Sequence, residues 1–250
     1  MCYALFMKKN KAISTVFVLM SILLVSCNKK EEPVVIDGVL NTSNIDKDNL
    51  SIDIFLLGEP TLNISPLMQK YELPPWIYDE PKWADKRLYN VTPDNLKGTA
   101  NMYKLCTFET YLEYEKHIYQ IDNGLSFGGS GASHFAHVHD GKGFDVLFSV
   151  CSWGSGHHQT YLTAFNFKTK TNYQCNQRFD HPSSIDETGQ LVDFMFVYEN
   201  NTLNLYRGYY DVEQFELYED AKTTFPQGIR PTALEYTDIF NLEFKNADMK

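Results

Sequence analysis

The stretch Gly124–Phe167, GLSFGGSGASHFAHVHDGKGFDVLFSVCSWGSGHHQTYLTAFNF, decides the fold of this chain. It holds five of the seven histidines and eight of the fourteen glycines, and three of its segments have the composition and length of β-strands. Those segments are His134–His139, Phe144–Cys151 and His158–Phe167. Because the turn Asp140–Gly143 between the first two is short, we expect them to be antiparallel neighbours.

Further runs of the same kind lie on both sides of this stretch. An alternating run, Leu50–Leu56, precedes it and is closed by Gly58 and Pro60. The runs that follow it are Asn172–Phe179, Leu191–Glu199 and Leu203–Tyr210, with Phe215–Tyr218 and Leu234–Phe244 as two expected edge strands. A twisted sheet of that size must curl or pack on a second sheet. The sequence therefore predicts a mainly β fold, an antiparallel meander that forms a barrel or a sandwich.

We expect one to three short helices, all in the N-terminal part. Ser65 is a suitable N-cap for a helix over Pro66–Tyr71, and Thr92–Pro93 offers another helix start. In Thr107–Tyr119 the spacing of the apolar residues fits one face of a helix and also fits one side of a strand. The acidic Glu109 near the start and basic residues near the end suit the helix dipole, so we predict a helix there.

The N-terminal residues have the features of a cleaved signal. From Met7 the chain reads MKKNKAISTVFVLMSILLVSC, a basic segment followed by the apolar run Ala12–Val25. That run is too short and too abruptly ended for a membrane-spanning helix. Its end, Leu24–Cys27, resembles the lipobox of bacterial lipoproteins. The resemblance implies translation from Met7, removal of residues 1–26, and a diacylglyceryl group on the Cys27 thiol.

The residues after Cys27 extend this resemblance. Asn28 stands where an aspartate would direct retention at the inner membrane, so the resemblance implies an outer-membrane lipid anchor, periplasmic or surface-exposed. The run Lys29–Glu32 is similar to surface-export signals of Bacteroidota lipoproteins, although a solvated tether has the same composition. We therefore expect a lipidated tether over residues 27–49 and one globular β-rich domain over residues 50–250, attached to the membrane through its lipid.

The charge of the mature chain limits its partners. Without the three lysines of the signal, 19 basic residues face 32 acidic ones, a net charge of −13. Such a surface repels phosphate backbones, so nucleic acid is not an expected partner.

A histidine cluster is the first candidate for chemistry. In a strand, His137 and His139 point to the same side, whereas His134 lies on the apolar side and is expected at the edge of the core. If Gly141–Gly143 is a three-residue loop with Gly143 in the left-handed conformation, His139 lies opposite Asp145.

This register places His137, His139 and Asp145 on one face, and His157 or His158 could join them from the next strand. Two imidazoles and a carboxylate can hold zinc, and an open position on the ion would permit hydrolysis. No HExxH or CxxC spacing accompanies them, and a solvated polar sheet face explains the same residues. A metal-dependent hydrolase is therefore the alternative to a protein with no cofactor.

Two common catalytic or phosphate-binding motifs are absent from the sequence. There is no GxSxG elbow, and Gly128–Gly131 precedes a strand pattern where a phosphate loop needs a helix. After lipidation the chain keeps Cys106, Cys151 and Cys175, which allow at most one disulfide, with Cys151–Cys175 the conceivable pair.

An aromatic segment is the second candidate. Trp76, Tyr78 and Trp83 lie in a proline-rich segment, where their rings either cover the core or stack on sugar faces. The sequence thus favours an anchored, non-catalytic domain that binds a glycan or an envelope protein. A protective immunity or inhibitor lipoprotein is a further alternative.

Overall fold

The computed structural model describes residues 38–43, 45–72, 87–105, 109–121, 134–153, 157–182, 190–211 and 233–247. The chain divides into two compact units, Met1–Ile36 and Asp37–Lys250, and every described residue belongs to the second. Within the described ranges, no helix has both the length and the hydrophobicity that crossing a bilayer requires.

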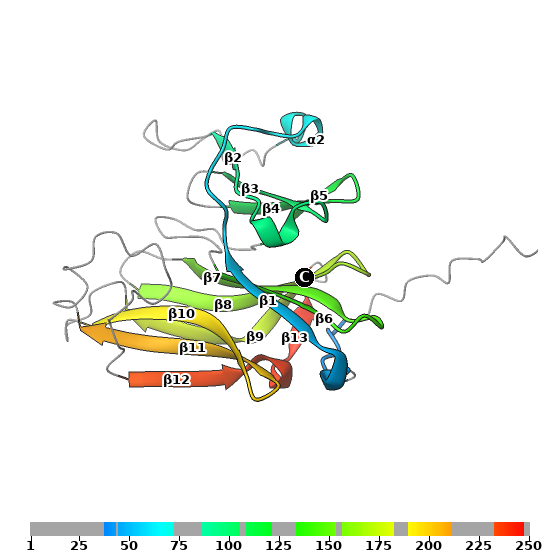
Figure 1. The fold of residues 1–250 in the computed structure, drawn as a ribbon. Helices are drawn as coiled ribbons and strands as arrows, with labels where there is room; N and C mark the ends of the chain where they lie inside the picture. The colour runs from blue at the N-terminus through cyan, green and yellow to red at the C-terminus, as the bar shows by residue number, and fades with distance from the viewer. Residues whose placement is uncertain are drawn as a thin grey trace, which may run out of the picture. The chain divides into compact units, whose positions relative to one another are not determined.

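The described chain is mainly β, and its antiparallel strands form three sheets in a sandwich-like arrangement, as predicted (Figure 1). Sheet A has the order β1 (Ser51–Leu56), β6 (His134–His139), β7 (Asp145–Trp153), β8 (His157–Asn166), β9 (Thr171–Pro182) and β13 (Phe244–Asn246). Sheet B consists of β2 (Leu88–Asn90), β3 (Asn101–Leu105), β4 (Glu109–Tyr114) and β5 (His117–Gln120). Sheet C consists of β10 (Gln190–Glu199), β11 (Thr202–Asp211) and β12 (Ala233–Asp238).

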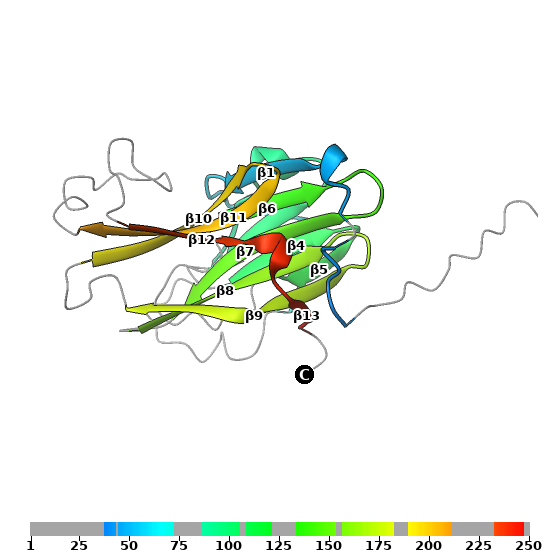
Figure 2. The same ribbon diagram turned by 90° about the horizontal axis from the view of Figure 1, so that it is seen from below.

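Sheet A is the middle layer because both of its faces are buried. Alternate residues of a strand point to opposite faces, and in β7 Phe148 belongs to one core cluster while Leu147 belongs to another. The Phe148 cluster includes Phe194 and Leu205 of sheet C, and the Leu147 cluster includes Met102 of sheet B. Figure 2, seen from below, shows β10–β12 beside the strands of sheet A. The molecule is therefore layered in the order B, A, C.

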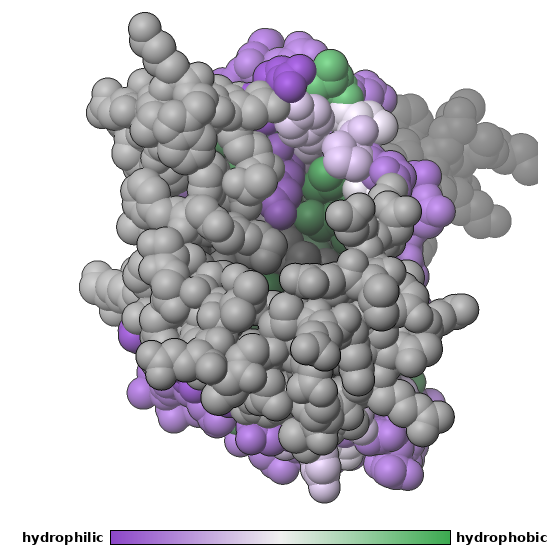
Figure 3. Space-filling view, turned by 90° about the vertical axis from the view of Figure 1, so that its left-hand side faces the viewer, coloured by the Kyte–Doolittle hydropathy of each residue, from purple (hydrophilic) through white to green (hydrophobic). Residues whose placement is uncertain are grey.

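Sheet B is covered on its far side as well. The helix α2 (Pro66–Gln69) places Met68 in a third cluster with Tyr103 and Tyr111. Its Ser65 side chain accepts a hydrogen bond from the Met68 backbone N–H at 3.0 Å, which confirms the predicted N-cap. In the view of Figure 3 the outer coloured residues are mostly hydrophilic, with hydrophobic residues visible toward the middle.

The helix predicted over Thr107–Tyr119 was wrong. Its described residues form the hairpin of β4 and β5, with Tyr114 paired to His117. Glu115 and Lys116 both have positive φ, +45° and +64°, which is the geometry of a two-residue hairpin turn. This turn contains no glycine or asparagine, so the usual sequence signal for it is missing. The start at Thr92–Pro93 yields only the short 3₁₀ helix Asp94–Leu96.

The fold begins earlier than the predicted boundary at residue 50. Leu40 and Ile45 are buried in the core between sheets A and C, and the Leu40 N–H donates to the Phe244 carbonyl at 2.9 Å. Val39 forms an isolated bridge with Lys245, beside the edge strand β13. Residues 38–49, expected in the tether, are therefore part of the domain. Their apolar residues are too widely spaced to form a strand pattern.

The last predicted run, Leu234–Phe244, supplies two edge strands. β12 closes one edge of sheet C and β13 pairs with β9 at an edge of sheet A. The 3₁₀ helix Ile239–Asn241 between them buries Ile239 and Phe240 against the core. The other predicted edge strand, Phe215–Tyr218, lies outside the described residues.

Candidate functional site

The predicted register of the histidine strand is confirmed. β6 pairs with β7 so that His139 lies opposite Asp145, His137 opposite Leu147 and His134 opposite Val150. His137 and His139 therefore share the face of sheet A that packs on sheet B, at the end of the sheet. His134 lies on the other face and is half-buried, as expected for a histidine at the core edge.

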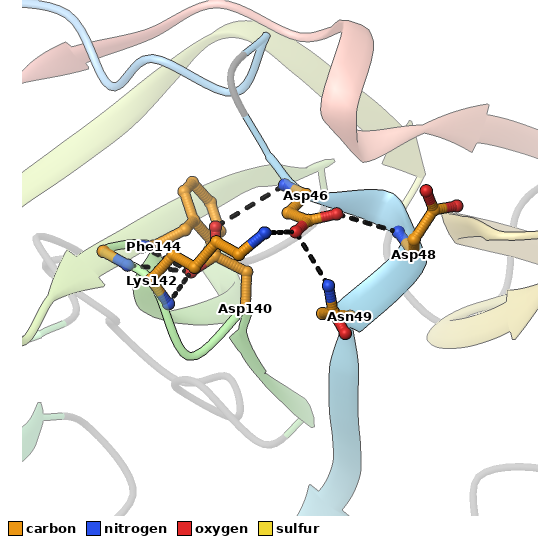
Figure 4. Close-up of polar contacts among 7 residues, drawn as sticks. Asp46, Asp48, Asn49, Asp140, Lys142 and Phe144 are labelled. Carbon is orange, nitrogen blue, oxygen red and sulfur yellow. Dashed lines mark hydrogen bonds and ion pairs between the residues drawn. The ribbon is translucent and has the colours of Figure 1, made fainter.

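The loop that sets this register is held by one carboxylate (Figure 4). Asp140 accepts hydrogen bonds from the backbone N–H groups of Lys142, Gly143 and Phe144 at 2.8–2.9 Å. Desolvation raises the pKa of Asp140, but these backbone donors outweigh it and lower the pKa to about 2. The left-handed residue is Gly141, with φ +69°, and not Gly143 as predicted. The left-handed position is therefore two residues earlier than predicted, beside the Asp140 side chain that caps the turn.

The same loop is tied to the start of the domain. The Lys142 ammonium group pairs with the Asp46 carboxylate, which also accepts a hydrogen bond from the Asn49 side chain at 2.9 Å (Figure 4). These contacts lower the pKa of Asp46, chiefly through Lys142. The residues before β1 therefore brace the loop between β6 and β7.

The closest polar contact in the cluster joins His137 to Asp145. The His137 Nε2 atom lies 2.7 Å from Asp145 Oδ1, and the imidazole side chain is 13% exposed against 46% for the carboxylate. The His139 ring lies 5.4 Å from the His137 ring, and the Phe167 ring packs against His137 at 5.2 Å. His137 is thus held between an aromatic ring and a carboxylate, and His139 lies beside the His137 ring.

The β4–β5 hairpin borders this cluster. Its Glu115 carboxylate forms an ion pair with Lys170 at 2.5 Å. Burial is the main cause that raises the pKa of Tyr114, followed by the charges of Glu115 and Asp145. Asp145 is therefore close enough to Tyr114 to affect its ionisation. The rim of the cluster is a mixture of aromatic and charged groups.

The structure brings together three of the four predicted metal ligands and separates the fourth. The His157 backbone lies near Trp153, since Trp153 pairs with Gln159, whereas Phe167 at the other end of β8 lies beside Asp145. Ten residues of strand separate His157 from Phe167, or roughly 33 Å. Within the described part of the chain, no three His, Cys, Asp or Glu side chains converge enough to hold a metal ion. The described residues therefore do not provide a set of side chains placed to bind one zinc ion.

The cluster has the geometry of an oriented imidazole. Asp145 fixes His137 as a carboxylate fixes a general base, but nucleophilic catalysis also needs a hydroxyl or thiol within reach of the base. Among the described residues, no Ser, Thr or Cys side chain hydrogen-bonds to His137 or His139. The arrangement can orient a proton acceptor and accept hydrogen bonds.

The cysteine prediction is corrected by the layers. Cys151 and Cys175 are both buried and free, and they pack in different core clusters on opposite faces of sheet A. β8 lies between their strands, so no disulfide joins them. Cys106 lies outside the described residues.

A surface pair of tyrosines was missed by the sequence reasoning. Tyr236 on β12 is 73% exposed, and its ring lies 6.0 Å from the ring of Tyr206 on β11. The two residues pair directly across the strands. Tyr206 was recognised only as part of a strand, and its neighbour is 30 positions away in sequence. The expected sugar-stacking residues Trp76, Tyr78 and Trp83, and the glycine run Gly128–Gly131, lie outside the described residues.

No protein-family model, curated protein or solved structure shows a significant match to this chain. Every functional statement about it therefore depends on its own residues and their geometry.

Proposed function

We propose that this protein is a lipid-anchored protein of the bacterial outer membrane whose β-sandwich domain binds a glycan or an envelope protein without catalysing a reaction. The lipobox-like residues at Cys27 support the anchor. The observation that carries the binding role is the outward face of sheet C, where Tyr206 and Tyr236 present adjacent aromatic rings to solvent.

The length of chain between anchor and domain suits a tethered receptor. Ten residues lie between Cys27 and Gly38, where the described fold begins, which gives eleven Cα–Cα steps. Fully extended, they span roughly 36–40 Å. A ligand-binding domain on such a tether stays within a few nanometres of the membrane surface, where envelope glycans and proteins are concentrated.

The anchor is tested by mass and fractionation. In a bacterial host, the wild-type chain should begin at Cys27, carry the mass of its acyl chains, and sediment with the outer membrane. The Cys27→Ser variant should lack the acyl mass and leave the membrane fraction. An unmodified residue 27 in the wild-type chain would contradict the proposal.

The binding role is tested with the mature Cys27→Ser chain, which has no lipid to cause sedimentation. We expect it to bind isolated envelopes. Protease treatment of the envelopes should abolish binding if the ligand is a protein, and periodate oxidation should abolish it if the ligand is a glycan. Absence of binding to any envelope preparation would contradict a binding role.

A further inference from the structure

The outward face of sheet C contains a row of side chains that folding does not require. Met195, Tyr206 and Tyr236 are direct cross-strand neighbours on β10, β11 and β12. The inward residues of the same strands, such as Phe196 and Leu205, are buried against sheet A. Because strand residues alternate between faces, the row points away from the core.

Within this row Tyr236 is 73% exposed, and Tyr206 lies half-buried beside it. Single exposed apolar residues are common, but adjacent large rings at a surface indicate a contact site. The Tyr206 and Tyr236 rings are inclined by 42° to each other. The Tyr206 hydroxyl donates to the Glu199 carboxylate, which fixes the position of that ring. The pair is thus a twisted, partly rigid aromatic platform.

The charge around the platform selects the class of ligand. Sheet C has no lysine in its strands, and the Glu199 and Asp238 carboxylates share the face of Tyr206 and Tyr236, whereas Glu235 lies on the opposite face. Its single arginine, Arg207, lies 3.5 Å from the Glu235 carboxylate. Anionic ligands such as phosphates and uronic-acid polymers would be repelled. Carboxylates can instead accept hydrogen bonds from hydroxyl groups.

We propose that Tyr206 and Tyr236 form a binding site for an uncharged glycan, with sugar rings stacked on the two tyrosines and the sugar hydroxyl groups donating to carboxylates on the same face, such as Glu199. Flat rings offer apolar faces that match the C–H faces of sugars, and carboxylates at the edge match the hydroxyls. This proposal depends on the binding role proposed above and assigns both its site and its ligand class.

The test measures binding of the mature Cys27→Ser chain to soluble polysaccharides by affinity electrophoresis and calorimetry. The probes are uncharged polymers (dextran, laminarin, mannan and xylan), acidic polymers (alginate and hyaluronan), and oligolysine. We expect at least one uncharged polymer to bind and the acidic polymers not to bind. Tyr236→Ala and Tyr206→Ala should each weaken binding about tenfold or more.

The matched control is Tyr198→Ala. Tyr198 is another tyrosine of sheet C, 36% exposed, on the opposite side of β10 from Met195. Its replacement should leave affinity unchanged, and Tyr236→Trp should retain binding because a larger ring is kept. Unchanged circular dichroism and melting temperature identify the variants that remain folded.

Three outcomes would overturn the proposal: binding to acidic polymers or oligolysine alone, no binding to any uncharged polymer, or uncharged-polymer binding that survives loss of both tyrosines. The envelope assay separates this failure from failure of the proposed function. If the Tyr206→Ala, Tyr236→Ala double variant still binds envelopes, the domain is a receptor that uses another site. If the wild-type chain binds no envelope, the receptor role itself is wrong.

Discussion

The two faces of sheet A are buried by different means. The face toward sheet C is covered mainly by apolar side chains, among them Val146, Phe148 and Leu162. The buried Thr160 and the half-buried His134 lie on the same face. The face toward sheet B buries Phe135 and Phe165 but also the hydroxyls of Ser149 and Thr163. The first face depends mainly on hydrophobic burial, and the second depends also on a set of hydrogen bonds between layers.

The buried hydroxyls on the second face are satisfied by one another and by sheet B. Ser149 Oγ lies 2.5 Å from Thr163 Oγ1, and Thr163 donates to the Ile121 carbonyl at 2.9 Å. The Asn172 amide also donates across the layers, to the Gln120 carbonyl at 2.9 Å. Because hydrogen bonds are directional, they fix the position of sheet B relative to sheet A. Hydrophobic burial on the other face is non-directional, so it favours contact between sheets A and C without fixing their relative position as closely.

Removal of a large ring from the apolar face should have the largest effect. Phe148 is fully buried and packs 5.4 Å from the ring of Phe244 on β13. Phe148→Ala should reduce the free energy of unfolding by about 3–5 kcal/mol, since it leaves a cavity between sheets A and C. Urea denaturation measures this change in unfolding free energy, and the control Tyr236→Ala should change it by close to zero. A loss below about 1 kcal/mol would indicate that this face is not tightly packed.

Loss of one buried hydroxyl should reduce the free energy of unfolding by less than the loss of Phe148. It should weaken the contact between sheets A and B. Thr163→Val conserves shape, removes the donor to the Ile121 carbonyl, and leaves Ser149 with only its longer contact to the Cys151 thiol at 3.9 Å. We expect a loss of about 1–3 kcal/mol in unfolding free energy.

Ser149→Ala is the matched control, because it keeps the Thr163 bond to Ile121 and should cost less. A double-mutant cycle with both changes measures the coupling between the two hydroxyls. Equal effects of the two single variants, with no coupling, would mean that the bond to Ile121 contributes nothing.

The apolar face also predicts a pH dependence. Burial of His134 lowers its pKa to about 4, from an ordinary value of 6.5. The folded state therefore holds the imidazole neutral, and protonation favours the unfolded chain. Stability from this group is complete above pH 6.5 and falls as the pH decreases toward 4, by on the order of 1–2 kcal/mol.

Melting temperatures from pH 7 to pH 4 measure this slope. His134→Gln, which cannot be protonated, should be less sensitive to acid in this range than the wild-type chain. His117→Gln is the matched control, since His117 is exposed on the β4–β5 hairpin and should leave the slope unchanged. Identical slopes for the wild-type and His134→Gln chains would contradict burial of this imidazole.

The strands of the apolar face were largely predictable from the sequence, and the contacts of the polar face were not. Val146, Phe148 and Val150 alternate plainly, and the pairing of His139 with Asp145 followed from keeping such residues on one side. The hairpin at Glu115–Lys116 was missed because neither residue is typical of a left-handed turn. The hydrogen bond from Thr163 to the Ile121 carbonyl joins residues 42 positions apart, and no local sequence pattern predicts it. The tyrosine platform likewise requires the pairing of β11 with β12.

The histidine cluster at the open end of the polar face should contribute least to stability and gives the sharpest test of the zinc alternative. The His137–Asp145 contact is half exposed on the carboxylate side, so Asp145→Asn should change the unfolding free energy by about 1 kcal/mol or less. The purified mature chain should contain zinc well below one equivalent, and a His137→Ala, His139→Ala variant should have the same content. Stoichiometric zinc that disappears in that variant would show that the two imidazoles rearrange around an ion, and the metal-dependent hydrolase would then replace the binding domain as the better hypothesis.

Because Asp145 already fixes the Nε2 atom of His137, such an ion would have to bind His137 through Nδ1, with Asp145 orienting the ring. Asp145→Asn would then weaken zinc binding while leaving the fold intact, a result that a purely structural contact would not give.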